Sequence, residues 1–451
     1  MKVQLSFKFI CISIFALISI SCNQKTEKNS TLFNTKKISK TSTLADLDQF
    51  VNFIKETHPR IGYTTDERSL DSAVESIQQK IKDSMSVNEV WDLFATLNPI
   101  FNDAHVGLIA PENIYQEYLS SGGFKTPFSI KIKNSSIFLK NTNSDVYNKY
   151  RGHKIVSING IKATAILEQL LPKMRGESRS LQELILSKRF HIFFTLYYGD
   201  FKEHVIELIN EQDNIQLITI ESKEFQDSNV KNNKENYYDF EKVNDSIAYL
   251  KISSFDIENK DAFEKYLENT FTEVFANDIS NLIIDIGENG GGARDLSDLL
   301  LDYLTVNKYT ATSKIEARVT KDNKSLIPNS QLGDVVTVPY PNWVIPKNET
   351  NVFNGDVYVL VSEQSYSQAI VFAAIIQDFN LGKIVGKETA GKANQTGQVQ
   401  KQQLNHTGFT VYCPIYIFSR VKVIDESRGI IPDVEVNYSM AKEKVLSLIN
   451  Q

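Results

Sequence analysis

The sequence predicts a multi-domain α/β protein, and three patterns support this prediction. Apolar residues with helical spacing dominate residues 44–100, short alternating strands follow after residue 127, and the last two hundred residues alternate apolar strands with amphipathic helices. Such alternation is typical of a mainly parallel sheet covered by helices. The length of 451 residues corresponds to about three folding units, at roughly 150 residues per unit.

The composition argues against several classes of protein. The chain has 49 Lys and Arg against 55 Asp and Glu, so its formal net charge of -6 offers no basic surface for nucleic acid. Three cysteines cannot form a disulfide framework in a chain of this length, and no C-x-x-C or H-E-x-x-H motif is present to bind zinc. We therefore expect a globular protein with no nucleic-acid partner, and neither a metal ion nor an organic cofactor is implied.

The first 21 residues have the layout of a secretory signal. Lys2 and Lys8 precede an apolar run over residues 9–20, and the chain turns polar after Ser21 and Cys22. This run of about 12 residues is too short to cross a bilayer, for which about 20 are needed. We expect residues 1–21 to direct export.

Cys22 points to a lipoprotein. A small residue directly before the first cysteine after the apolar core is typical of the lipoprotein processing site, although Ser19 stands where Leu is usual. The expected product is lipidated on Cys22 and anchored in the cell envelope, at the outer membrane or the periplasmic face, through a polar tether over residues 22–42. Cys413 would then be the free thiol of the mature chain, because Cys11 leaves with the signal. A plain signal peptide with an incidental cysteine is the alternative.

Two units are expected before the strand and helix alternation begins. Residues 43–112 form a helical unit, with apolar residues at helical spacing over 44–54, 70–81 and 90–97. Residues 113–224 form a β-rich module. Its expected elements are strands at 128–133, 137–140 and 152–160 and a helix at 166–174. A polar linker over residues 225–238 follows.

The third unit, residues 239–440, carries the α/β pattern, and residues 441–451 are expected to be a C-terminal tail. Its expected elements are strands at 247–252, 281–286 and 357–361 and helices at 260–275, 296–304 and 366–379. Ligands of parallel sheets bind at the carboxyl ends of the strands. We therefore expect the functional residues where these strands end.

Two of these strand ends carry unusual residues. Residues 285–292 read Asp-Ile-Gly-Glu-Asn-Gly-Gly-Gly, and such a run lets the backbone approach an anion with its N–H groups, although three glycines alone are more often a tight turn. The run lacks the order of a nucleotide-binding motif. The next strand end leads to Ser367 at a helix start, where the residue is either a helix N-cap or a nucleophile presented on a strand-to-helix turn.

Taken together, the motifs resemble those of the C-terminal processing peptidases, a family of serine peptidases that includes the tail-specific proteases and the tricorn core protease. The resemblance covers most of residues 44–440. The motifs that carry it are residues 102–105, 152–160, 249–255, 285–292, 386–392 and 429–433 together with Ser367. It implies a catalytic core of the ClpP/crotonase-like type and a PDZ-like fold for the β-rich module.

A serine nucleophile needs a base, and the resemblance implies two candidates. In the tricorn-like branch the base is a His held by a Glu, which correspond here to His105 and Glu426. In the tail-specific branch a Lys follows the serine by 25 residues, which corresponds to Lys392. We favour His105, because the pKa of an imidazole is already near neutral pH, whereas the pKa of a Lys must be lowered before it can accept a proton.

The sequence departs from the family motifs in two places. Gly287 stands where an Arg is usual, two residues after the motif aspartate, so the sequence does not identify which residue supports the glycine run. Thr396 stands where the Lys branch has Gln, with Gln395 one position early, which weakens the Lys392 assignment.

The resulting hypothesis is a serine endopeptidase that hydrolyses protein or peptide substrates. Ser367 would attack, His105 with Glu426 would move the proton, and the N–H groups of Gly290 or Gly291 and of Gln368 would hold the oxyanion. The alternative from another class is a ligand- or peptide-binding lipoprotein on the same fold. An esterase of α/β-hydrolase type is less favoured, because only His406 could serve as its histidine.

Overall fold

The computed structural model describes residues 36–224, 237–348, 351–422 and 425–450. The expected signal, Cys22 and most of the expected tether and linker lie outside these ranges. The last tether residues do have structure, because β1 (Lys37–Ser39) pairs with β2 (Ser84–Ser86), and α2 begins at Lys40. The folded part therefore starts several residues before the expected boundary at residue 43.

The N-terminal unit is helical, as predicted. Ser39 and Asp66 each accept a backbone N–H three residues on, and these caps set where α2 and α3 begin. The apolar faces of the helices pack together, and each fully buried Leu, Ile or Phe contributes about 1.5–3 kcal/mol. The helices are α2 (Lys40–Thr57), α3 (Glu67–Lys80), α4 (Val87–Phe94) and α5 (Asn98–Phe101).

The β-rich module contains an antiparallel sheet with the strand order β10-β9-β7-β6-β5. Its strands are β5 (Phe128–Lys133), β6 (Ser136–Thr142), β7 (Lys154–Ile158), β9 (Glu203–Ile209) and β10 (Ile215–Glu221), with helices α6 (Glu112–Ser120) and α7 (Ala163–Leu170). The predicted strands and the helix near 166–174 are confirmed. The 20-residue helix α8 (Arg179–Tyr198) was not predicted. It starts at the Ser178 cap, ends at Gly199 and packs on β5, where Phe190 contacts Phe128. Among the described residues, no helix is both long and apolar enough to cross a membrane.

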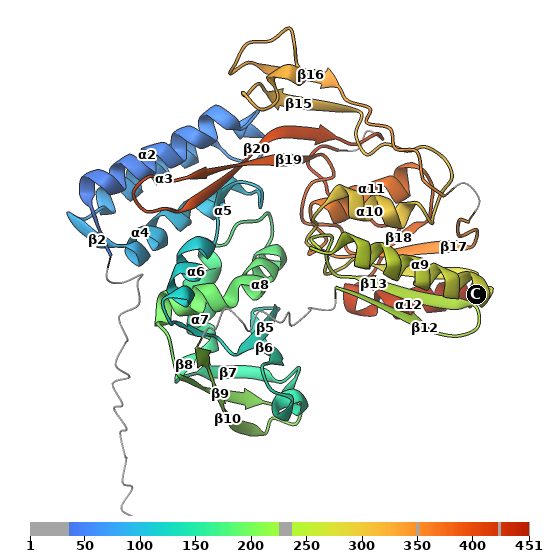
Figure 1. The fold of residues 1–451 in the computed structure, drawn as a ribbon, viewed down its shortest axis with the longest axis horizontal. Helices are drawn as coiled ribbons and strands as arrows, with labels where there is room; N and C mark the ends of the chain where they lie inside the picture. Colours follow the sequence, from blue (N-terminus) through green and yellow to red (C-terminus); the bar gives the residue numbers. More distant parts are fainter. Residues whose placement is uncertain (1–35, 225–236, 349–350, 423–424, 451) are drawn as a thin grey trace, which may run out of the picture.

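The third unit is built on a six-stranded sheet with the order β12-β13-β14-β17-β18-β21. Figure 1 labels β12, β13, β17 and β18 of this sheet. All neighbours in the sheet are parallel except β12 and β13, so the predicted mainly parallel sheet is confirmed. The strands are β12 (Tyr238–Lys242), β13 (Ile247–Ile252), β14 (Asn281–Asp285), β17 (Asp356–Val361), β18 (Lys383–Gly386) and β21 (Val434–Glu435).

Helices cover both faces of this sheet. On one face lie the predicted helices, α9 (Lys260–Ala276), α10 (Arg294–Leu301) and α11 (Gln368–Asp378), which share one apolar core with β13, β14 and β17. On the other face lies α12 (Ala441–Ile449), whose Ala441 and Val445 pack against Ile283 and Leu360. The expectation of a tail over 441–451 is therefore wrong, because these apolar residues complete the core on that face.

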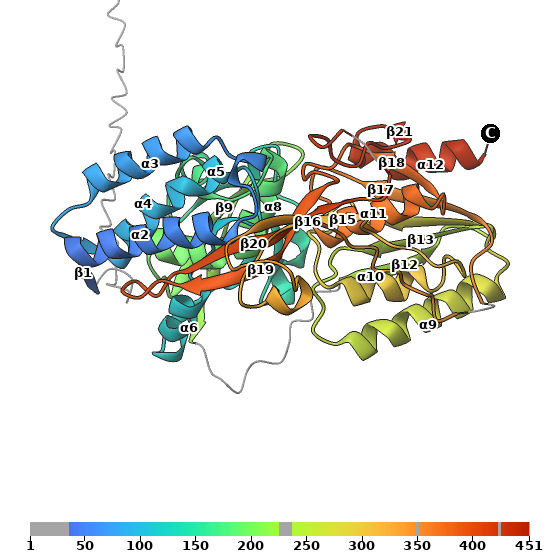
Figure 2. The ribbon, with the colours of Figure 1, turned by 90° about the horizontal axis from the view of Figure 1, so that it is seen from above.

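A second sheet connects the third unit to the N-terminal helices. Strands β19 (Gln395–Gln403) and β20 (Thr410–Ser419) form a long hairpin beside α2 (Figures 1 and 2). Beyond β20 lie β15 (Lys314–Arg318) and β16 (Val335–Pro339), and β20 also pairs with the short strand β3 (Gly107–Leu108). One apolar core runs from the N-terminal helices into the β-rich module and the hairpin. The boundary expected at residue 112 is therefore not a break in packing.

Candidate active site

The two strand ends that the sequence singled out lie side by side. Strands β14 and β17 are adjacent and parallel, so the glycine loop (residues 285–292) and the turn before α11 leave the same edge of the sheet. The Ser365 hydroxyl donates to the carbonyl of Ile286 at 2.8 Å, and Tyr366 N–H donates to the carbonyl of Asn289 at 2.9 Å. These bonds fix the glycine loop against Ser367.

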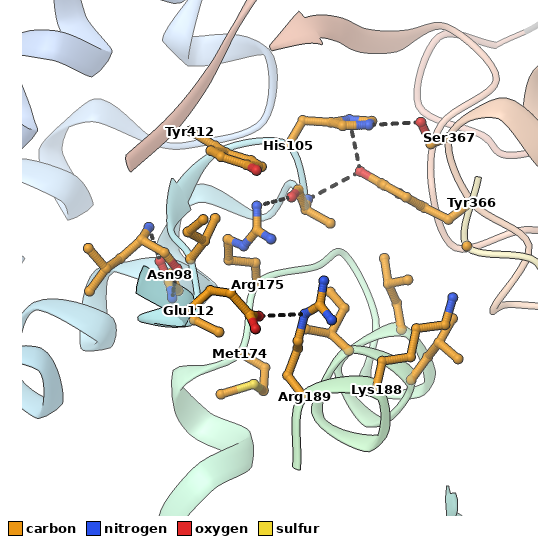
Figure 3. Close-up of a pocket in the computed structure, with 18 of the residues that line it drawn as sticks. Asn98, His105, Glu112, Met174, Arg175, Lys188, Arg189, Tyr366, Ser367 and Tyr412 are labelled. Atoms are coloured by element: carbon orange, nitrogen blue, oxygen red, sulfur yellow. Dashed lines mark hydrogen bonds and ion pairs between the residues drawn. The ribbon is translucent and has the colours of Figure 1, made fainter. Parts of the chain in front are cut away.

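Ser367 has a backbone conformation that is rare for a residue with a side chain. Its φ of 52° and ψ of -118° fall outside the allowed regions of most residues, at a cost of about 1–3 kcal/mol. Ser367 occupies the N-cap position of α11, but its side chain makes no capping bond, so the N-cap interpretation is wrong. Its Oγ instead lies 3.1 Å from Nε2 of His105 (Figure 3). Gln395 supports this turn by donating from Nε2 to the carbonyl of Ser367 at 3.1 Å.

His105 reaches the serine from the N-terminal unit. The chain leaves α5 through Asn102, which has a left-handed φ of 47°, and enters β3, which pairs with β20 of the third unit. Asn98 fixes this loop, because its side chain bonds both the N–H and the carbonyl of Leu108, at 2.8 and 2.9 Å. The base and the nucleophile thus come from segments 262 residues apart.

The other ring nitrogen of His105 faces a threonine and a tyrosine. Nδ1 lies 3.1 Å from Oγ1 of Thr396 and 3.2 Å from the hydroxyl of Tyr366. The Thr396 hydroxyl donates its proton to Oδ2 of Asp103 at 2.7 Å, so its lone pairs remain to accept from Nδ1–H of His105. The proton of a neutral His105 is thereby directed to Nδ1, and Nε2 is left free to accept the proton of Ser367.

Asp103 provides a buried negative charge behind His105. Its Oδ1 lies 3.5 Å from Nδ1 of His105 and accepts the His105 backbone N–H at 2.7 Å. Burial raises the pKa of Asp103, but its hydrogen bonds with His105 and Thr396 and the charge of His105 outweigh burial and hold the pKa at about 2. Asp103 is therefore ionised at neutral pH and can stabilise an imidazolium at His105.

The structure separates the candidate N–H donors for an oxyanion. Gly291 N–H is taken, because it donates to Oδ1 of Asn289 at 2.8 Å. Gly291 remains essential for close approach, since a Cβ there would lie 2.6 Å from the Cβ of Ser367. In the described part of the chain, the N–H groups of Gly290 and Gln368 make no hydrogen bond. These two are the donors left for a substrate oxygen.

A tyrosine occupies the space that the family arginine would need at Gly287. A Cβ at Gly287 would lie 2.0 Å from the ring of Tyr438, which comes from the segment before α12. The Tyr438 hydroxyl bonds both carboxylate oxygens of Asp285 at 3.0 Å, and Gly287 N–H donates to the same carboxylate at 2.8 Å. Tyr438 therefore supports the start of the glycine loop in this protein.

Glu426 and Lys392 do not join the site. Glu426 is exposed beside Tyr63, and no hydrogen bond in the described residues links it to His105. Lys392 donates from Nζ to the carbonyl of Tyr63 at 2.8 Å and lies over its ring at 4.0 Å. Burial lowers the pKa of Lys392, as a base would require, but no contact with Ser367 is present in the described residues. The expected pairing of Glu426 with His105 is therefore not formed, because Thr396, Tyr366 and Asp103 already surround Nδ1.

His406 and possible metal ligands were also considered from the sequence. His406 lies exposed at the turn between β19 and β20, away from Ser367. Across the four described ranges, no cluster of three His, Cys, Asp or Glu side chains is placed to hold a metal ion.

Glu177 of the β-rich module also contacts the site. Its Oε1 lies 2.9 Å from the Tyr366 hydroxyl, and its Oε2 accepts the N–H of Ala104 at 3.3 Å. Tyr366 has one proton to donate but lies 3.2 Å from a carboxylate oxygen of Asp103 and 2.9 Å from one of Glu177. A proton on Glu177 relieves this shortage. Burial and the nearby charge of Asp103 raise the pKa of Glu177 to about 8, in keeping with a protonated carboxyl.

This raised pKa predicts a pH-dependent stability. Between about pH 4.3, where the glutamate of an unfolded chain titrates, and about pH 8, the folded protein holds a proton that the unfolded chain has lost. The stabilisation is therefore fully present at the acid end of this window and is lost as the pH rises through it. We expect the melting temperature to fall less steeply between pH 5 and 8 in Glu177→Gln than in the unmodified protein. Equal slopes by calorimetry would show that Glu177 is not protonated in the fold.

The sequence did not point to Asp103, Thr396, Tyr366 or Glu177 as members of the site. The spacing Asp-x-His in residues 103–105 was a usable signal for Asp103, because a carboxylate two residues before a turn histidine can reach its backbone N–H and ring. Thr396 and Glu177 come from distant segments and gave no local signal, and Tyr366, although it directly precedes Ser367, is contacted by Glu177 and Asp103 only in the fold.

A cavity of about 560 Å³ opens beside Ser367 and His105 (Figure 3). One wall is formed by Gly290, Tyr366 and Ser367 of the third unit, and another by Met174, Arg175 and helix α8 of the β-rich module. A peptide in this cavity would contact both units.

Comparison with known proteins shows similarity to serine peptidases. Residues 246–436 match the model described as Peptidase family S41. A stretch of 173 residues is 31% identical to the tail-specific protease of Haemophilus influenzae, and covers 36% of this chain but 20% of that protein. A structure of mature CPAF shares the fold with a TM-score of 0.60 and 14% identity, and the match covers 91% of this chain and 95% of that one. A structure of mature CPAF complexed with lactacystin has a TM-score of 0.61 and 15% identity, over 91% of this chain and 97% of that one. Residues 246–436 therefore resemble an S41 peptidase domain, and part of the chain is similar in sequence to a tail-specific protease.

Proposed function

We propose that this protein is a serine peptidase with Ser367 as the nucleophile and His105 as the general base. The observation that carries the proposal is the 3.1 Å contact between Ser367 Oγ and His105 Nε2, made by a serine that is held in a rare conformation instead of capping its helix. The match of residues 246–436 to the S41 peptidase family supports the same reaction class.

The geometry supports the following reaction. Ser367 Oγ attacks the carbonyl carbon of a peptide bond, while its proton passes to Nε2 of His105. The negative charge on the carbonyl oxygen is held by the N–H groups of Gly290 and Gln368, each worth about 3 kcal/mol. Nε2–H then protonates the leaving amine, so an acyl group remains on Ser367. Water, deprotonated by His105, releases this acyl group as a carboxylate.

We assign the positioning of His105 to Asp103 and Thr396 in place of Glu426. Thr396 accepts from Nδ1–H and passes its own proton to Asp103, so the ring keeps the tautomer that the reaction needs. The imidazolium formed after the attack lies 3.5 Å from the ionised Asp103. A charge in this buried position stabilises the transition state more than an exposed carboxylate could.

Contacts between the β-rich module and the glycine loop support a role for the module in binding the substrate chain. Glu288 of the glycine loop forms ion pairs with Lys131 of β5 and, at 2.9 Å, with Lys251 of β13. The module is therefore bonded to the loop that would hold the oxyanion. We propose that a protein or peptide substrate passes between the module and Ser367, and that the module has the PDZ-like role that the family resemblance implies.

A fluorophosphonate probe tests the proposed nucleophile. The unmodified protein should incorporate one probe molecule, with the adduct on Ser367 by peptide mass spectrometry, and Ser367→Ala should incorporate none. A protein that folds normally and stays unlabelled would instead favour the non-catalytic binding protein.

We also propose that the protein is exported and lipidated on Cys22, because basic residues, an apolar run and a small residue precede that cysteine. In cells, the full chain should then partition into the detergent phase of Triton X-114, and Cys22→Ala should move it to the aqueous phase. Equal partitioning of both forms would contradict lipidation.

A further inference from the structure

One wall of the cavity beside Ser367 is rich in cations. Four cationic side chains line the cavity, against two carboxylates, although the whole chain is acidic. The cations are Lys173, Arg175, Lys188 and Arg189, and the carboxylates are Glu112 and Asp256. All four cations come from the β-rich module, from α8 or the segment before it. Lys173 is already neutralised, because its Nζ lies 2.6 Å from the carboxylate of Asp92.

Arg175 is a partly buried guanidinium that forms no ion pair within the described residues, although the charge of Asp103 acts on it. Its Nη1 donates to the carbonyl of Ala104 at 2.5 Å, and the group lies over the ring of Tyr412 at 5.4 Å. No carboxylate of the described residues forms an ion pair with it. Burial lowers the pKa of Arg175, which reflects the cost of holding this charge away from water. A guanidinium has five N–H donors, so Arg175 has capacity for a further acceptor from the cavity.

Arg189 and Lys188 extend from α8 into the same cavity (Figure 3). Arg189 is only loosely paired, with its Nε 3.8 Å from Glu112 and both side chains about half exposed, at 51% and 42%. The Lys188 ammonium lies beside the glycine loop, since a Cβ at Gly290 would be 3.2 Å from its Nζ. The positive charge of Arg189 acts against that of Arg175. An anion placed between them would relieve this repulsion.

We propose that Arg175, Lys188 and Arg189 form an anion subsite that binds a carboxylate of the substrate close to the bond that is cut. This inference rests on the proposed peptidase function and names its substrate class, which is peptides that carry a carboxylate near the cleaved bond. Arg175 bonds the carbonyl of Ala104, the residue before His105, so the bound carboxylate lies near the reacting atoms. An extended chain rises about 3.3 Å per residue, which limits the acidic group to a few residues from the cleavage site.

The carboxylate could belong to an Asp or Glu side chain or to the end of the substrate chain, and paired peptides separate these sources. Internally quenched peptides would carry Glu or Gln at each position around one cleavage site, and each would be made with a free or an amidated C-terminus. We expect kcat/KM to be at least about tenfold higher for the acidic member of one pair, as for hydrogen bonds to charged groups. The preference should shrink as NaCl rises from about 0.05 to 0.5 M. Ratios near one for every pair would overturn the proposal.

Charge variants test which residues form the anion subsite. Arg189→Glu should abolish the preference for the acidic peptide while the neutral peptide is still cut, and Lys188→Gln should reduce the preference. Arg179→Gln is the matched control, because Arg179 lies on the same helix, 3.6 Å from Glu183, and does not line the cavity. This variant should keep the full preference. An unchanged preference in both Arg189→Glu and Lys188→Gln would overturn the proposal.

Binding without turnover separates this inference from the proposed function. In Ser367→Ala, the fluorescence anisotropy of a labelled acidic peptide should show binding at least about tenfold tighter than that of its neutral partner. If the protein cuts no peptide but this difference is present, the peptidase reaction is wrong and the anion subsite stands. If peptides are cut and the fluorophosphonate adduct forms on Ser367, but no acidic peptide binds more tightly, the anion subsite is wrong.

Discussion

Replacing His105 with alanine is expected to lower kcat/KM for a quenched peptide by about 10⁴-fold or more, because Ser367 then has no group to take its proton. Ser367→Ala should cause a loss of similar size, and the double variant should be little worse than either alone, since the two residues act as one unit. Fluorophosphonate labelling of Ser367 should slow in parallel in His105→Ala. Steady-state kinetics and the labelling rate check this result.

Lys392→Met is the matched test of the other base. Lys392 bonds the Tyr63 carbonyl and packs on its ring, so methionine keeps much of the packing and removes only the charge and the hydrogen bond. We expect this variant to retain most of the activity. Near-full activity in His105→Ala, together with loss of activity in Lys392→Met, would reverse the assignment of the base.

The second large effect is expected at Asp103. Asp103→Asn removes the buried charge behind His105 and supplies an amide that can donate to Thr396, so the threonine can turn its own proton toward Nδ1. The ring would then favour a proton on Nε2, which cannot accept from Ser367. We expect kcat to fall by about 10²- to 10⁴-fold with a small change in KM, measured by steady-state kinetics.

Glu426→Gln is the control for this prediction, because it makes the same carboxylate-to-amide change at the position that the family resemblance favoured. Glu426 is exposed and does not contact His105 in the described residues, so its variant should keep kcat close to that of the unmodified protein. Thr396→Val should lower kcat as Asp103→Asn does, since it breaks the link between His105 and Asp103. A large loss in Glu426→Gln with normal kcat in Asp103→Asn would restore the expected pair.

The elements that the sequence predicted are those with a strong local signal. The buried strands β14 and β17 and the helices α9 and α11 follow directly from apolar runs and helical spacing. The turn of the hairpin at residues 405–408 has a sequence signal, but strand β19 was missed because it reads Gln-Thr-Gly-Gln-Val-Gln-Lys-Gln-Gln, with almost no apolar alternation, and is held mainly by pairing with β20. Helix α12 was missed because its few apolar residues matter only when placed against β14 and β17.

By itself, the sequence determined the chemistry that this protein could carry out: a serine at one strand end, a glycine run at another, a histidine two residues after an aspartate, and the order of motifs shared with one peptidase family. Only the tertiary structure decided which of these groups meet. His105 faces Ser367 and Thr396 across 262 and 291 residues of chain, because β3 pairs with β20 and β14 lies beside β17. Hydrogen bonds between such distant residues depend on how the strands pair and the units pack, and the local spacing of residues does not predict either.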